Sequence, residues 1–324
     1  MDRATLKELL RLAYPMIISQ GAFAVMIFTD RYFMSLVSPT HMGASLAGGV
    51  ASFFCMSLFI GVLSYGNALT AQYFGRKQFD KCSRVVTQGL LLTLFFAPLL
   101  VAIGYLSLGS FEFMGHAPEQ VVLARQYFII LIWGASFSLA KTCIASYFSG
   151  IGRTHIVMIA DTVGVAINIP LTWVLIFGYG EVPALGIAGA AYATIISSLI
   201  SLLIFCYFYL EPHHATSFMV KQSFQLDRGI LRRFVRLGFP SGIEMFLNVA
   251  AFNLFLLMFQ SYGIAESASA AIVFNWDIVS FVPMIGLNVA IISLIGRYIG
   301  AGDTTLMSQV IRISFMLGLG YSSI

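Results

Sequence analysis

Four acidic residues stand inside long apolar stretches of this sequence, and they are the first candidates for chemistry. Moving a charged group to the centre of a bilayer costs about 2.5–3.5 kcal/mol on insertion scales, so acids in such surroundings are functional candidates by default. The acids are Asp30, Asp161, Glu244 and Asp277, and the uncharged polar residues beside them are Asn168, Thr172 and Asn248. A carboxylate in an apolar pocket binds a proton or a small cation strongly, so ion binding is the chemistry that these residues indicate.

Spacing places several of these residues on common helix faces. Asn168 and Thr172 follow Asp161 by seven and eleven residues, which puts all three on one face of an α-helix. Glu244 and Asn248 are four residues apart and share a face as well. Each residue also has a structural interpretation: Asp161 can lie at a hydrated helix end, and Asn168 can bond to a neighbouring helix.

The dipeptide Asp30-Arg31 has two interpretations. Asp30 lies about 27 Å along a helix that starts near residue 12, at about 1.5 Å per residue, which is in the far half of a bilayer. Asp30 could pair with Arg31 at the membrane surface, although adjacent residues do not share a helix face. Alternatively, Arg31 extends to water while Asp30 points into the protein. Position alone does not decide between them.

Nothing in the sequence indicates an enzyme or a bound cofactor. The histidines occur in connections, without a catalytic or metal-binding arrangement. The four cysteines, Cys55, Cys82, Cys143 and Cys206, lack CxxC spacing and are expected to be small buried residues. No GxxxxGK[ST] motif is present, so we expect no ATPase activity.

Composition defines the class of protein. Hydrophobic residues make up 59% of the 324 residues and charged residues only 10%, against about 25% charged residues in soluble domains. The apolar runs are long enough to cross about 30 Å of hydrocarbon as helices, and they do not alternate as the strands of a membrane barrel do. We therefore expect an all-α integral membrane protein, with no nucleic-acid partner despite the net charge of +4.

The apolar runs predict eight membrane spans and the beginning of a ninth. Basic residues collect in alternate connections, which by the positive-inside rule places the N-terminus and the segment 211–236 in the cytoplasm. The predicted spans are 12–36, 45–74, 84–108, 121–149, 156–178, 185–210, 237–262 and 269–299, with the ninth beginning near Leu306. We expect a multi-pass protein of the plasma or inner membrane.

An internal repeat organises these spans. "RLAYP" at 11–15 matches "RLGFP" at 236–240, and the same offset of 225 residues pairs Gly61 with Gly286 and Gly75 with Gly300. Six spans per unit is an even number, so the two repeats would be parallel. The predicted organisation is a six-helix lobe (1–210), a cytoplasmic linker (211–236) and the start of a second lobe (237–324), truncated after about two and a half helices.

Several segments together resemble the multidrug and toxic compound extrusion (MATE) family. They are the Pro15-to-Asp30 spacing, "GRKQFDKCSRVVTQG" at 75–89, "SGIGRT" at 149–154, "INIPLTWVLIFGYG" at 167–180, "LGIAGAAYATIIS" at 185–197 and "LGFPSGIE" at 237–244. The resemblance covers the whole chain. It implies two six-helix lobes in a V-shaped arrangement that exports organic cations and drugs in exchange for H⁺ or Na⁺.

The resemblance also assigns residues. Asp30 matches the family's acid on the first helix, and Asn168 matches the asparagine of the same ion site, so a Na⁺ ion could bind at Asp30 and Asn168. Thr172 stands where the family usually has an aspartate, and Asn248 stands where many members have an acid, with Glu244 one turn earlier. These departures leave the choice between H⁺ and Na⁺ open.

Other transport functions fit the sequence less well. A flippase for lipid-linked saccharides is the alternative, but its cavity should contain basic residues for the pyrophosphate, and only Lys141 and Arg31 are candidates. A channel does not account for the repeat, and a major-facilitator transporter should carry a different motif after the second span. We expect a monomeric antiporter whose partners are cationic small molecules and the bilayer.

Overall fold

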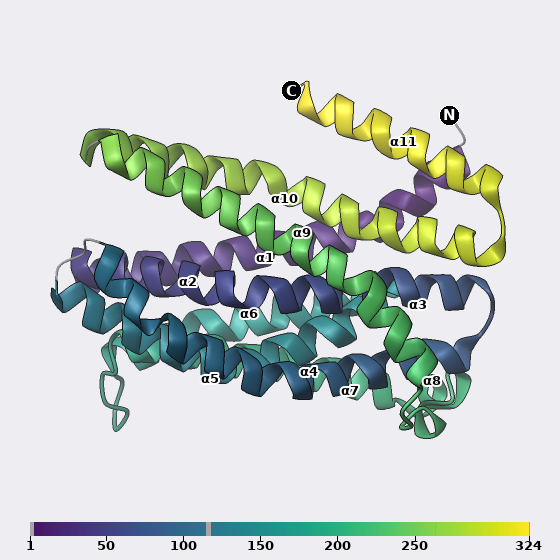
Figure 1. The fold of residues 1–324 in the computed structure, drawn as a ribbon, viewed down its shortest axis with the longest axis horizontal. Helices are drawn as coiled ribbons and strands as arrows, with labels where there is room; N and C mark the ends of the chain where they lie inside the picture. The colour runs from purple at the N-terminus through teal and green to yellow at the C-terminus, as the bar shows by residue number, and fades with distance from the viewer. Residues whose placement is uncertain (1–2, 115–117, 263, 324) are drawn as a thin grey trace.

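The protein is a bundle of long α-helices (Figure 1). The computed structural model describes residues 3–114, 118–262 and 264–323, with side chains outside 113–117, 256–257 and 259–278. The elements are α1 (Arg3–Val37), α2 (Pro39–Ser64), α3 (Gly66–Gly75), α4 (Phe79–Ser107), η1 (Leu108–Met114), α5 (Pro118–Gly150), α6 (Thr154–Phe177), α7 (Ile187–Leu210), α8 (Pro212–Ser217), η2 (Val220–Gln222), α9 (Arg228–Tyr262), α10 (Ile264–Ala301) and α11 (Thr304–Ser322).

Seven helical stretches within the described residues are long and apolar enough to cross a membrane. They confirm the prediction of an all-α membrane protein with many spans. The predicted span 237–262 is not among these seven stretches; it is part of α9, which begins nine residues earlier than expected, at Arg228. Asp227 explains this start, because its Oδ1 accepts hydrogen bonds from the backbone N–H groups of Gly229 and Ile230, both at 3.0 Å.

Two groups of helices meet along α1 and α2. α1 packs on α6 and α10, while α2 packs on α5 and α9. In Figure 1, α9 and α10 lie on one side of α1 and α2, and α4–α7 lie on the other. We call the end of the bundle that carries the connections 76–78, 151–153, 211–227 and 302–303 the basic end, because it contains most of the loop lysines and arginines.

The two groups of helices are joined most tightly at the basic end. Arg233 on α9 donates to Gln72 Oε1 at 2.6 Å, and Ser293 on α10 donates to the carbonyl of Ser149 at 2.6 Å. Glu8 on α1 accepts a hydrogen bond from the Tyr298 hydroxyl at 2.8 Å. Toward the opposite end, α9 and α10 diverge from α1 and α2 (Figure 1).

Contacts at the basic end follow the offset of 225 residues. A Cβ atom added to Gly75 would collide with the carbonyl oxygen of Arg297, and one added to Gly300 would collide with that of Gln72. Residue 72 corresponds to 297 and residue 75 to 300 under the offset, so each contact is the counterpart of the other. These reciprocal contacts support the duplication inferred from the sequence.

Substituting Gly75 or Gly300 should weaken the contact between α3 and α10. In Gly75→Ala or Gly300→Ala the new methyl group has no space beside a backbone carbonyl, so we expect a loss of about 1–3 kcal/mol of stability, seen as a lower Tm of the purified protein. Gly109→Ala is the control, because nothing lies within 4 Å of a Cβ there. Equal Tm values for the three variants would contradict the close approach.

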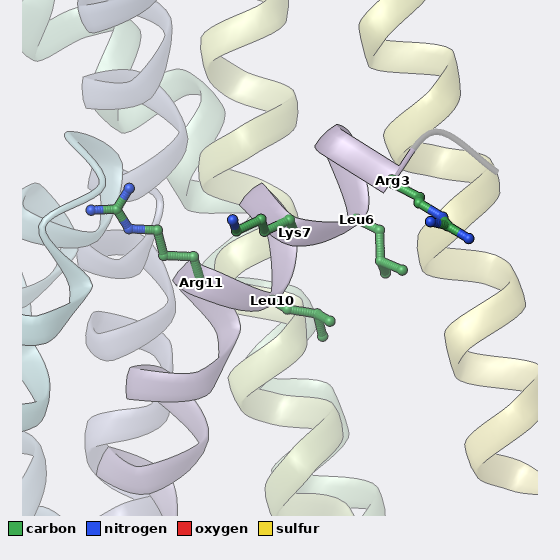
Figure 2. Close-up of a pocket in the computed structure, with 5 residues that line it drawn as sticks. All are labelled: Arg3, Leu6, Lys7, Leu10 and Arg11. Atoms are coloured by element: carbon green, nitrogen blue, oxygen red, sulfur yellow. The ribbon is translucent and has the colours of Figure 1, made fainter.

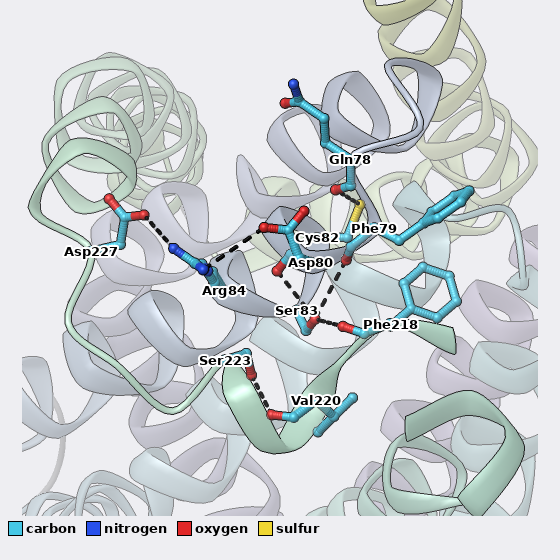
Figure 3. A network of polar contacts seen from close by, with 10 residues as sticks. All are labelled: Gln78, Phe79, Asp80, Cys82, Ser83, Arg84, Phe218, Val220, Ser223 and Asp227. Atoms are coloured by element: carbon cyan, nitrogen blue, oxygen red, sulfur yellow. Dashed lines mark hydrogen bonds and ion pairs between the residues drawn. The ribbon is translucent and has the colours of Figure 1, made fainter. Parts of the chain in front are cut away.

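Polar contacts fasten the connection between the two groups of helices to the start of α4 (Figure 3). Ser83 donates to the carbonyl of Phe218, and Gln88 Nε2 donates to the carbonyl of Gln225 at 2.8 Å. Arg84 lies 3.4 Å from Asp227, the residue that caps α9. The connection is therefore an ordered part of the basic end.

His214 on α8 is fully buried in this connection. Arg153 donates to its Nδ1 at 3.2 Å, and a guanidinium group can only donate, so the ring proton is on Nε2 and points to the Tyr147 oxygen, 3.0 Å away. Burial, followed by the charges of Arg153 and His213, lowers the pKa of His214 from 6.5 to about 4.

This geometry predicts an acid sensitivity. The unfolded chain binds a proton on His214 below pH 6.5, and the folded chain binds it only below about pH 4, so stability is present above pH 6.5 and declines toward pH 4. His214→Gln should flatten that decline in Tm, whereas His213→Gln, at an exposed neighbour, should not. Identical pH profiles for both variants would contradict the assignment.

Candidate functional site

The predicted site residues Asp30, Asn168 and Thr172 come together between α1 and α6. Asn168 and Thr172 are both fully buried on the face of α6 that the spacing predicted. The carboxylate of Asp30 on α1 faces the hydroxyl groups of Thr172 and of Thr194 on α7. The structure therefore supports the interpretation in which Asp30 points into the protein.

Small polar residues on α7 hold α6 in this position. Asn168 Nδ2 donates to Ser197 Oγ at 3.2 Å, and Ser201 Oγ donates to the carbonyl of Ala160 at 3.0 Å. Pro170 lies inside α6 two residues after Asn168 and removes one backbone N–H from the helix. These features fix the α6 side of the site.

Three oxygen atoms of this site are buried without a hydrogen bond. They are Asp30 Oδ1, Asn168 Oδ1 and Thr172 Oγ1. Buried polar atoms are nearly always paired, and an unpaired one requires an explanation such as a missing ion. Three acceptor oxygens on facing helices are suitable partners for a proton on the carboxylate or for a Na⁺ ion.

Tyr127 on α5 adds a group that the sequence did not indicate. Tyr127 is 7% exposed, and its hydroxyl is near Thr194 and within electrostatic range of Asp30 and Arg31. Tyr127 and Thr194 stand among many similar residues in apolar runs, without a helix-face pattern linking them to Asp30. Only the packing of α5 and α7 against α1 brings them to the site.

Asp161 belongs to a second polar group, nearer the basic end. Its Oδ1 lies 3.0 Å from Nζ of Lys141 on α5, and its Oδ2 accepts a hydrogen bond from Ser19 on α1. The side chains of Lys141 and Asp161 are 26% and 16% exposed. The structure thus separates Asp161 from the Asp30 site and gives it its own counter-charge.

The other predicted residues do not join the site. Glu244 and Asn248 are exposed on α9, in the other group of helices. The side chain of Asp277 lies outside the described residues. Among the described residues, no three histidines, cysteines or acids are arranged to hold a metal ion.

A shallow pocket of about 460 Å³ lies elsewhere, at the beginning of α1 (Figure 2). Its lining consists of Arg3, Leu6, Lys7, Leu10 and Arg11. It opens at the basic end, far along α1 from Asp30, and contains no acid. We therefore place the candidate site at Asp30 and not at this pocket.

The unpaired oxygen of Thr172 gives a direct test of the site. Thr172→Val keeps the shape and removes a buried hydroxyl without a partner, so we expect the ion-free protein to become more stable, by about 1 kcal/mol. Thr93→Val is the control, because its buried hydroxyl donates to the carbonyl of Gly89 at 3.0 Å and its loss should lower the Tm. A lower Tm for Thr172→Val would show that the hydroxyl is already satisfied.

Comparison with known proteins identifies the family. The MatE family model matches residues 15–174 and 240–324, two segments that begin at the prolines of the repeated motif. Together they cover most of the chain.

Bacterial multidrug resistance proteins are among the similar sequences. "Probable multidrug resistance protein YoeA" of Bacillus subtilis is 29% identical over 287 residues, which are 85% of this chain and 61% of that protein. Multidrug resistance protein PmpM of Pseudomonas aeruginosa is 27% identical over 327 residues, covering 99% of this chain and 68% of that protein. The chain therefore spans about two thirds of the length of such relatives.

Solved structures share the fold. A MOP superfamily transporter from Pyrococcus furiosus superposes with a TM-score of 0.88 at 22% identity, covering 98% of this chain and 70% of that one. The eukaryotic MATE transporter AtDTX14 superposes with a TM-score of 0.86 at 16% identity, covering 97% and 70%. With its helical membrane fold, its repeated proline motif and the family match over both segments, this chain belongs to the MatE family, the multidrug and toxic compound extrusion transporters.

Proposed function

We propose that the complete protein exports organic cations, including drugs, in exchange for H⁺ or Na⁺ bound at Asp30. The observation that carries this proposal is the set of three buried, unpaired oxygens of Asp30, Asn168 and Thr172. Leaving such atoms unpaired costs free energy unless an ion or a proton satisfies them during the working cycle. Relatives named as multidrug resistance proteins support the class of substrate.

The way in which the two groups of helices meet supports alternating access. With the N-terminus in the cytoplasm, the basic end is the cytoplasmic end, and the hydrogen bonds of Arg233, Ser293 and Glu8 close it. The conformation is then the outward-facing one. Returning to the inward-facing state requires these contacts to break while the groups rock about α1 and α2.

The coupling step takes place on α1. When a cation or proton reaches Asp30, the carboxylate loses its unpaired charge, and the α1–α6 seam can tighten around Thr172 and Asn168. Pro15 gives α1 a weak point, since it removes one hydrogen bond of the helix. A change at Asp30 can thereby alter the angle of α1 and release a bound organic cation.

The alternative function, a flippase for lipid-linked saccharides, lacks a suitable basic cavity. Lys141 is occupied by Asp161 at 3.0 Å and is not available for a pyrophosphate. Arg31 is near Tyr127 and next to Asp30. The charge in this lobe therefore favours a cationic substrate over an anionic lipid.

Asp30→Asn tests the proposal. The amide cannot exchange a proton or balance a cation, so ion-driven drug efflux from vesicles that contain the full-length transporter should fall to the level of empty vesicles. Separate Na⁺ and pH gradients identify the coupling ion. Glu181→Gln, at an exposed position in the connection before α7, is the control and should retain efflux. Full ion-driven efflux by Asp30→Asn would overturn the assignment.

A further inference from the structure

We propose that Lys141 is a built-in counter-ion that permanently occupies Asp161, so that this lobe presents one acid, Asp30, to the coupling ion. This inference rests on the proposed function of Asp30. In this inference Lys141 acts through Asp161: by neutralising that carboxylate, it determines how many cations the lobe can bind. The argument depends on the two polar contacts that connect α1 to α6.

Those contacts are in register. Ser19 on α1 meets Asp161 on α6, and eleven residues further along both helices Asp30 meets Thr172. Eleven residues make about three turns, so both contacts lie on the same faces of the two helices, about 16 Å apart along them. The α1–α6 seam thus contains two carboxylates, each opposite a hydroxyl group of the other helix.

The two carboxylates differ in their partners. Asp161 has the ammonium group of Lys141 at 3.0 Å on one oxygen and the Ser19 hydroxyl on the other. Asp30 Oδ1 and Asp161 Oδ1 are both buried without a hydrogen bond, but the Asp161 atom has the ion pair with Lys141, whereas Asp30 is in none of the ion pairs of the described residues. Since only an unpaired carboxylate needs an external cation or proton, the difference explains why Asp30 and not Asp161 is free for coupling.

The surroundings of Asp161 provide no substitute for Lys141. Of the helices packed against this part of α6, α1 contributes the uncharged Ser19, and α7 contributes Ser201, whose hydroxyl is bonded to the Ala160 carbonyl at 3.0 Å. Among the ion pairs of the described residues, Asp161 pairs with Lys141. Removing the lysine therefore leaves a largely buried carboxylate that must take up a proton or Na⁺ instead.

The test is the number of ions that the full-length transporter binds. In Lys141→Met we expect a new uptake of H⁺ or Na⁺, seen as a Tm that rises with falling pH or rising Na⁺ more steeply than in the wild type. In proteoliposomes the steady-state drug gradient should depend on the ion gradient with an exponent of about two, against about one for the wild type, if each site carries one ion.

Two further variants control for folding and for charge. Lys141→Met combined with Asp161→Asn removes both charges, so this double variant should show the ion dependence of the wild type. Lys141→Arg keeps the positive charge and should also show the ion dependence of the wild type. An unchanged ion dependence of a folded Lys141→Met protein would overturn the inference. The inference would also be overturned if Lys141→Met failed to fold at every pH and Na⁺ concentration while the double variant folded.

Failure of the proposed function at Asp30 can be distinguished from failure of this inference about Lys141. If the wild type shows no response of drug efflux to either ion gradient, the function at Asp30 fails. The Tm measurement on Lys141→Met still decides whether Lys141 keeps a cation out of the Asp161 site.

Discussion

The absence of water inside the bilayer is the constraint on which this structure depends. A polar atom at that depth must find its partner on another helix or on an ion. Serines of α7 pair with the amide nitrogen of Asn168 and with the Ala160 carbonyl, and Lys141 forms an ion pair with Asp161. One oxygen each of Asp30, Asn168 and Thr172 remains buried without a hydrogen bond, and this is the site that we propose for the coupling ion.

The predictable part of the fold came from patterns that the membrane imposes. Apolar runs located the helices, and the spacing of Asp161, Asn168 and Thr172 identified one face of α6. The same spacing could not show that Asp161 belongs to a different polar group from Asn168 and Thr172, because residues on one helix face can contact different neighbouring helices at different turns. Lys141 lies on α5, and only the packing of three helices brings it to Asp161.

The glycine contacts at the basic end join equivalent positions of the two repeats. Gly75 and Gly300 let α3 and α10 approach at a point where each repeat contributes the same pair of positions. The sequence contains the two glycines, but their offset alone does not show that they face each other's carbonyl partners.

The matching intervals between contacts on α1 and α6 constrain how α1 can move. Because Ser19 is hydrogen-bonded to Asp161 and Asp30 faces Thr172 at the same separation on both helices, sliding α1 by one turn would break the hydrogen bond and separate Asp30 from Thr172 at the same time. A sliding movement of α1 along α6 would therefore change both places at once. A bend at Pro15 precedes both residues in the chain, so it too would move Ser19 and Asp30 together.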